Sequence, residues 1–200
     1  AVPSSFEASV DSAQVKSAML LAALNTRGTT KYAERTLTRD HTERMLMYFG
    51  GKIKTKKTEN GYAHYVQGLQ ELKPQEVTVP SDPSSASFFI AAALMVEGSD
   101  ITIKNICMND TRIGFLKVVE LMGARIEVNN KKNICGEPVA DLRVKHSSLR
   151  GVKVPRDLVA SMIDEFPVLS VLAAVAEGKT EMKEIGELKV KESDRILSMA

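Results

Sequence analysis

Charged side chains crowd the stretch from Glu187 to Arg195, directly before an apolar run. Residues 189–191 alternate as the end of a strand would, and Ser193 or Asp194 could cap a helix whose apolar side we expect to be buried. A turn between a strand and a helix is where α/β proteins hold anions, because free backbone N–H groups and the helix dipole add to the side-chain cations. The stretch predicts an anion site, and the alternative is a solvated, charged helix start.

A carboxylate in apolar surroundings is the second candidate for chemistry. Asp164 lies between apolar residues, directly ahead of an almost wholly apolar helical segment, so its carboxylate should be partly desolvated. Such a group can act as a general base. The alternative is a simple helix cap, because Pro167 suits the first turn of a helix. We expect the neighbouring Glu165 to face solvent.

Two further positions are suited to a phosphate. Ser12, Ala13 and Gln14 begin an apolar helix with polar side chains and free backbone N–H groups, although Ser12 could be an ordinary cap. Arg39 could hold an anion through two parallel hydrogen bonds, although an exposed arginine is the commoner case. Together with the basic stretch before Arg195, these residues predict an anionic substrate.

The elements that must position these residues recur three times along the chain. Each repeat has an apolar helix, a glycine, an alternating strand, a polar turn and a second helix, and the glycines are Gly28, Gly98 and Gly178. The spacing of about 70 to 80 residues is too long for a solenoid and fits a βαβαββ module. The pattern therefore predicts an α/β fold made of repeated modules, with a strand expected at residues 180–185 in the third.

An aspartate precedes the second helix of every repeat, with an arginine nearby. These aspartates are Asp40, Asp110 and Asp194. We expect all three to cap their helices, at about 1 kcal/mol for each cap. Between the first two repeats, Val79–Pro83 holds two prolines, which stop any helix, so the domain boundary is expected near residue 80.

The composition is that of a globular protein. The 200 residues are 44% hydrophobic and 26% charged, with a net charge of +2, which is too small for a nucleic-acid partner, and no apolar run reaches the roughly 18 residues of a membrane span. Cys107 and Cys135, without a secretory signal, indicate reduced thiols and a cytoplasmic protein. The three histidines lie far apart, so we expect no metal site. Because the chain starts without methionine and ends inside a helical pattern, we expect an internal piece of a longer protein.

Five segments resemble the signature segments of the 5-enolpyruvylshikimate-3-phosphate synthase family, in the wording of its bacterial class II form, the group that includes glyphosate-tolerant enzymes. They are Ser12–Ala18, Thr38–Leu46, Asp82–Ala86, Ser161–Pro167 and Leu188–Arg195. The resemblance implies transfer of the enolpyruvyl group of phosphoenolpyruvate to the 5-hydroxyl of shikimate-3-phosphate, with release of phosphate, in the shikimate pathway to chorismate and the aromatic amino acids.

The resemblance also implies an architecture. Members of this family have two domains, each of three βαβαββ modules arranged as an inside-out α/β barrel, with the active site in the cleft between them. Residues 1–80 would be the last module of one domain, and residues 81–200 would be one and a half modules of the second. We expect a monomer at full length.

Each matching residue receives a role from the resemblance. Asp164 would accept the proton of the substrate 5-hydroxyl as this oxygen attacks C2 of phosphoenolpyruvate, and Glu192 would transfer a proton at C3. Gln14 and Arg195 would bind phosphoenolpyruvate. Shikimate-3-phosphate would be held by Ser12, Ala13, Gln14, Arg39, Asp164 and Lys191. Because phosphoenolpyruvate carries its own leaving group, we expect no metal and no cofactor.

Several family segments fall outside these 200 residues, among them the loop that largely sets the response to glyphosate, so we expect this chain to be inactive by itself. The first alternative is the related enolpyruvyl transferase that acts on UDP-N-acetylglucosamine. That enzyme uses a cysteine in a loop, and neither Cys107 nor Cys135 lies in a glycine-rich loop. The second alternative is a non-catalytic fragment.

Overall fold

The computed structural model describes residues 2–200, which divide into two compact units. The first unit contains the residues up to Val79 together with Ile134–Glu137, and the second contains Pro80–Asn133 and Pro138–Ala200. The break after Val79 falls at the proline-containing linker. The assignment of these units to particular domains of a longer protein stays a prediction.

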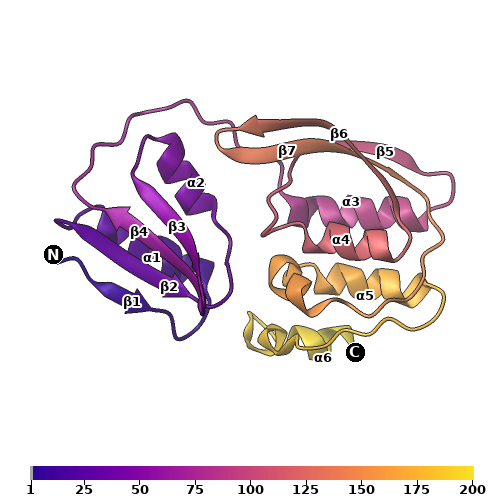
Figure 1. Cartoon of the computed structure of the whole chain (residues 1–200). Coiled ribbons are helices and arrows are strands. Elements are labelled where there is room, and N and C mark those ends of the chain that lie inside the picture. The colour runs from indigo at the N-terminus through magenta and orange to yellow at the C-terminus, as the bar shows by residue number, and fades with distance from the viewer. Residues whose placement is uncertain (1) are drawn as a thin grey trace. The chain divides into compact units, whose positions relative to one another are not determined.

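The first unit is a βαβαββ module (Figure 1). Its elements are β1 (Ser5–Glu7), α1 (Ala13–Ala23), β2 (Thr29–Glu34), α2 (His41–Tyr48), β3 (Ile53–Thr58) and β4 (Gly61–Gln67). The sheet order is β1-β2-β4-β3, with β1 parallel to β2 and the other pairs antiparallel. Leu20 of α1 and Leu46 of α2 pack with Tyr32 and Val66 of the sheet, so both helices cover the same face.

Local signals explain helix α1. Ser12 caps it, because the Ser12 side chain accepts a hydrogen bond from the backbone N–H of Val15. Its buried residues, Lys16, Leu20 and Ala23, follow the spacing of one helix face. A lysine thus occupies a core position of an apolar helix, which the sequence analysis did not predict.

The second unit begins with a module of the same kind. Its elements are α3 (Pro83–Met95), β5 (Asp100–Cys107), α4 (Gly114–Leu121), β6 (Arg125–Ile134), β7 (Glu137–Lys145), the 3-10 helix η1 (Arg156–Met162), α5 (Phe166–Val175), the 3-10 helix η2 (Gly186–Val190) and α6 (Arg195–Met199). The sheet order is β5-β7-β6. Ser81 pairs in parallel with Ile106 directly before α3, as β1 pairs with β2 in the first unit.

The core of the second unit lies between its sheet and three helices. Ile90 of α3, Phe115 of α4, Leu142 of β7 and Leu169 of α5 belong to one buried cluster. Helices α3 and α5 are apolar on most of their surface, so they also carry exposed apolar side chains, of which Phe88 is 65% exposed. Among the residues described, no single helix is long and apolar enough to cross a membrane; only the bent pair η1 and α5 meets the length and composition limits.

The third repeat differs from the expectation. Instead of a regular strand at 180–185, the described chain has two isolated parallel bridges, Arg150 with Glu177 and Lys153 with Glu181. Pro155 has no N–H group to extend the pairing, and the positive φ of 61° at Glu184 ends the extended conformation. Residues 189–191 also do not form a strand end, since η2 covers Gly186–Val190.

The aspartate caps were only partly predicted correctly. Asp194 caps α6 by accepting hydrogen bonds from the N–H groups of Ile196 and Leu197, but none of the described residues of this short helix is buried. Asp40 occupies the N-cap position of α2, but its side chain makes no capping hydrogen bond, and the residue at the N-cap of α4 is Ile113, not Asp110. The two carboxylate oxygens of Asp40 each lie 2.9 Å from Nε of Arg44, which donates to both. Asp110 pairs with Lys117.

The cap of α3 is Asp82, which accepts hydrogen bonds from the N–H groups of Ser84 and Ser85. We expect Asp82→Ala to lower the stability of the 200-residue chain by about 1 kcal/mol and its Tm by roughly 2–4 °C, because two N–H groups lose their acceptor. Asp82→Asn keeps the acceptor and should lose less. Asp110→Ala, at an 86% exposed side chain that caps nothing, is the control and should stay within about 0.5 kcal/mol. Calorimetric melting curves test this, and equal losses for Asp82→Ala and Asp110→Ala would contradict it.

Candidate functional site

Asp164 and Arg195 are in direct contact, although 30 residues separate them in the sequence. Nη1 of Arg195 donates to Oδ1 of Asp164 across 3.1 Å. The short helix α6 begins at Arg195, and Asp164 lies in the turn between η1 and α5. The Asp164 side chain is 33% exposed, so it is partly desolvated as expected, and it can still be reached from solvent. Helix α5 is preceded by Glu165 at the cap position, so Asp164 is not the simple cap that was the alternative.

The same arginine holds a second carboxylate. Nη2 of Arg195 donates to Oε2 of Glu192 across 2.6 Å. This hydrogen bond keeps the pKa of Glu192 below its usual value and raises the pKa of Arg195. The Glu192 side chain is 77% exposed. One guanidinium therefore joins the two carboxylates that the sequence analysis singled out, and its two outer nitrogens serve one carboxylate each.

Lys191 lies beside this group and makes a different contact. Its Nζ is 2.6 Å from Oε1 of Glu187, one helical turn earlier. The Lys191 side chain is 25% exposed and the Glu187 side chain 59%. A pair whose carboxylate is this exposed contributes little to stability, so Lys191 could exchange Glu187 for another anion at small cost. The crowded charges before α6 thus form two groups, one around Arg195 and one around Lys191.

The expectation for Glu165 was wrong, because this side chain is buried and only 3% of the residue is exposed. The hydroxyl of Ser84, at the start of α3, donates to Oε1 of Glu165. Nη2 of Arg112 donates to the Ser84 hydroxyl and to Oδ1 of Asp82. This polar cluster ties the start of α3 to the residue next to Asp164. The only sequence signal for this cluster is the position of Glu165 directly before Phe166. The partner Ser84 lies 81 residues earlier, and this pairing cannot be deduced from the position of Glu165.

The predicted phosphate residues of the first unit lie at the start of α1 and before α2. Ser12 is the cap and Ala13 the first residue of α1, while Gln14 is exposed. Arg39 is half-buried, directly before the residue that precedes α2. Arg39 directly follows Thr38 in the sequence, and the carbonyl oxygen of Thr38 accepts a hydrogen bond from Nζ of Lys16 on α1. These positions are therefore linked through a lysine that the sequence analysis did not single out.

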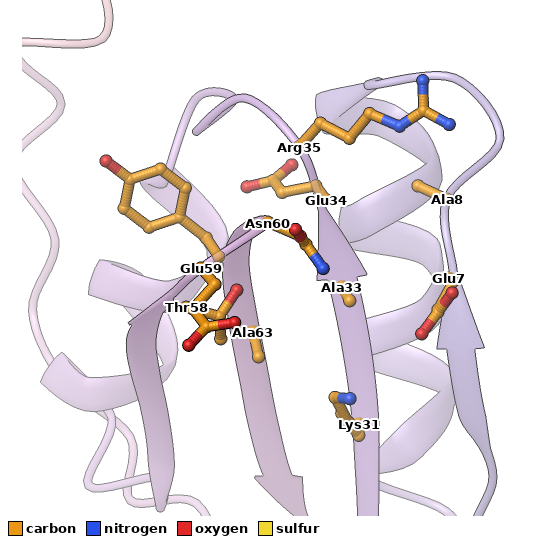
Figure 2. Close-up of a pocket in the computed structure, with 11 residues that line it drawn as sticks. Glu7, Ala8, Lys31, Ala33, Glu34, Arg35, Thr58, Glu59, Asn60 and Ala63 are labelled. Atoms are coloured by element: carbon orange, nitrogen blue, oxygen red, sulfur yellow. The ribbon is translucent and has the colours of Figure 1, made fainter.

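The hollows on the described part of the first unit include two near its sheet and helix α2. One of about 740 Å³ lies over the ends of β1 and β2 and the β3–β4 turn, as Figure 2 shows, and its lining includes Glu7, Lys31, Glu34, Arg35, Glu59 and Asn60. The other, of about 650 Å³, includes residues on both sides of Arg39, namely Leu37 and Asp40. Neither is lined by Ser12, Gln14 or Arg39 themselves. Both are wide open, so neither by itself indicates a ligand.

Comparison with known proteins gives a consistent result. A family model described as EPSP synthase (3-phosphoshikimate 1-carboxyvinyltransferase) matches residues 3–200. The chain is 52% identical over 201 residues to a protein of Sphingopyxis alaskensis and 53% identical over 199 residues to one of Paracoccus denitrificans, both named 3-phosphoshikimate 1-carboxyvinyltransferase. All of this chain is covered in both matches, and it spans 45% of the length of either relative.

Solved structures give the same picture. An EPSP synthase from Acinetobacter baumannii superposes with a TM-score of 0.90 at 42% identity, covering 99% of this chain and 44% of that one. The enolpyruvyl transferase NikO from Streptomyces tendae superposes with a TM-score of 0.66 at 20% identity, covering 89% of this chain and 43% of that one. At this lower identity the likeness to NikO concerns the fold alone.

Proposed function

This chain belongs to the EPSP synthase family, and from that premise we propose that the protein containing it transfers the enolpyruvyl group of phosphoenolpyruvate to the 5-hydroxyl of shikimate-3-phosphate. The observation that carries the proposal is the family match over residues 3–200. The family predicted from the five sequence segments is confirmed, as is the α/β fold of enolpyruvyl transferases. Because the chain spans 45% of these relatives, the activity is proposed for a protein of their length.

Asp164 is proposed as the general base. The reaction joins the 5-oxygen of shikimate-3-phosphate to C2 of phosphoenolpyruvate, while the hydroxyl proton leaves and C3 gains a proton. Phosphate then leaves C2 and C3 loses a proton, which restores the double bond. Asp164 is partly exposed and is held in place by a guanidinium, so its carboxylate is accessible and oriented for the substrate hydroxyl. Glu192, on the same guanidinium, is proposed to transfer the proton at C3.

Arg195 is proposed to bind the phosphoenolpyruvate anion. Its guanidinium is shared between Asp164 and Glu192. An incoming anion would compete with these carboxylates for its hydrogen bonds, and Glu192, the more exposed of the two, would be the easier partner to release. Loss of that bond would let the pKa of Glu192 rise toward its usual value, which favours a role in taking up and returning a proton.

The remaining site residues are proposed to hold the substrates. Shikimate-3-phosphate would contact Ser12, the backbone of Ala13, Gln14, Arg39, Asp164 and Lys191, and Gln14 would also contact phosphoenolpyruvate. What supports this is the position of the first three at a helix start and of the two cations on half-buried segments. A cytoplasmic monomer that works without a cofactor, without nucleic acid and away from membranes completes the proposal.

Product formation by the full-length protein tests the function. We expect inorganic phosphate and enolpyruvylshikimate phosphate to appear in equal amounts when the protein is mixed with phosphoenolpyruvate and shikimate-3-phosphate, as followed by ³¹P NMR. UDP-N-acetylglucosamine in place of shikimate-3-phosphate is the control and should release no phosphate. Release with the nucleotide sugar and none with shikimate-3-phosphate would overturn the proposal in favour of the related transferase.

A further inference from the structure

The first unit contains a buried set of charged side chains that the proposed mechanism does not use. Lys16, Glu34, Glu43 and His64 are each at most 3% exposed. Nζ of Lys16 is 3.0 Å from Oε1 of Glu34 and 2.9 Å from Oε1 of Glu43. The ring of His64 lies between the same two carboxylates, with Nε2 at 3.0 Å from Glu34 and Nδ1 at 3.3 Å from Glu43.

This buried set makes hydrogen bonds to all the polar groups of Thr38, namely its N–H, its hydroxyl and its carbonyl oxygen. Thr38 donates its N–H to Oε1 of Glu34 across 3.2 Å and its hydroxyl to Oε2 across 2.6 Å. The Thr38 carbonyl oxygen accepts from Nζ of Lys16 across 3.0 Å. Burial alone would raise the pKa of Glu34, but the hydrogen bonds from His64, Thr38 and Lys16 outweigh burial and keep it below its usual value. Glu34 therefore remains a charged acceptor.

Stability alone does not explain a lysine at this position. Leu20 and Ala23 share the buried face of α1 with Lys16, so an apolar side chain would suit the packing. A buried ion pair is often no more stabilising than apolar residues of similar volume. An apolar side chain, however, cannot donate to the Thr38 carbonyl oxygen or hold Glu34 in place. The observed arrangement orders the segment after β2.

Three further hydrogen bonds fasten the same segment to α1 and to the residue Asp11 just before it. The Asp11 carboxylate accepts from the N–H groups of Arg35 and Thr36 across 2.9 and 2.8 Å. The hydroxyls of Ser17 and Thr42 lie 2.6 Å apart. The two ends and the middle of the segment that carries Arg39 are thus tied to the segment that carries Ser12 and Gln14.

We infer that Lys16, through Glu34 and Thr38, is a positioning residue that sets Arg39 against the start of α1, so that Ser12, Gln14 and Arg39 can bind one phosphorylated substrate together. The inference rests on the proposed function, because it takes shikimate-3-phosphate as that substrate. A preformed arrangement of ligands spares the binding step the entropy of ordering a loop. Its loss weakens substrate and transition state alike, so KM rises while kcat changes little.

The test uses steady-state kinetics of the full-length protein with four variants. Thr38→Val removes the hydroxyl donor at nearly constant shape, and Thr38→Ser keeps it. Lys16→Met removes the ammonium at similar length, and Leu20→Ala damages the same helix face without touching the polar set. We expect Thr38→Val to raise KM for shikimate-3-phosphate about 5- to 30-fold and Lys16→Met about 10- to 100-fold, with kcat within about threefold of the wild type.

The controls separate positioning from general damage. Thr38→Ser should restore KM to within about twofold of the wild type, and Leu20→Ala should lower Tm without raising KM for shikimate-3-phosphate. The inference fails if Thr38→Val and Thr38→Ser have the same KM, or if Leu20→Ala raises KM as much as Lys16→Met. If Lys16→Met does not fold, the two Thr38 variants decide the matter. A wild-type protein with no turnover of shikimate-3-phosphate would overturn the proposed function itself, which is a different result.

Discussion

Asp164→Asn in the full-length protein should lower kcat by about 10²–10⁴-fold and leave the binding of shikimate-3-phosphate nearly unchanged. An amide has the shape of the carboxylate and can still accept the hydrogen bond from Nη1 of Arg195, so the geometry around the guanidinium should survive. It cannot accept the proton of the substrate 5-hydroxyl. The expected loss is therefore in the chemical step.

Two measurements separate these effects. Steady-state kinetics give kcat, and isothermal titration calorimetry gives the affinity for shikimate-3-phosphate. Asp157→Asn makes the same change at an exposed position of η1 and serves as the matched control, with kcat expected near that of the wild type. If Asp164→Asn raises KM for shikimate-3-phosphate and leaves kcat unchanged, Asp164 binds substrate and is not the base.

Arg195→Ala should raise KM for phosphoenolpyruvate by roughly 10- to 150-fold, which corresponds to about 1.5–3 kcal/mol for a hydrogen bond to a charged group. Arg195→Lys keeps the charge but not the fork that serves Asp164 and Glu192 with separate nitrogens, so we expect an intermediate loss. KM for shikimate-3-phosphate should change much less. Equal increases in both KM values would contradict a specific role toward phosphoenolpyruvate.

The same variant should alter the pH dependence. The hydrogen bond from Arg195 is the largest cause that lowers the pKa of Glu192, so its removal should raise that pKa. The acidic limb of kcat/KM, if it reports Glu192, should then move to higher pH. Arg156→Ala removes an arginine side chain that is 82% exposed and pairs with Glu184, and it serves as the control. An unchanged profile in Arg195→Ala would mean that another group produces that limb.

Elements with local signals were predicted well from the sequence. Helix α1 has its cap at Ser12 and a run of apolar residues. The sequence predicts a helix over Ser12–Leu24, and the observed helix, Ala13–Ala23, is one residue shorter at each end. Strand β3 (Ile53–Thr58) was missed because an edge strand with three lysines shows almost no apolar alternation. Strand β1 (Ser5–Glu7) was missed because it is short and wholly exposed.

The site shows the same division between local and distant causes. Asp194 was predicted as a cap because the N–H groups that donate to its carboxylate lie only two and three residues ahead, in the helix it caps. The burial of Glu165 depends on Ser84, and that of Lys16 depends on Glu34 and Glu43, which come from other segments. Polar residues at core positions are paired by tertiary contacts, and a single sequence does not show which partner will meet them. The family resemblance assigned Asp164 and Arg195 to one site, but their direct contact was not predicted, since spacing alone does not show it.

The buried set around Lys16 also constrains how this chain can change over generations. Loss of one member leaves an opposite charge buried without its partner, at a cost of about 3–5 kcal/mol, whereas joint replacement of the whole set by apolar residues can be neutral for stability. Single substitutions at Lys16, Glu34 or Glu43 should therefore be strongly epistatic. The set would be inherited as a block, retained or exchanged together, while the exposed residues Lys54, Lys56 and Lys57 of the neighbouring strand β3 can be replaced one at a time.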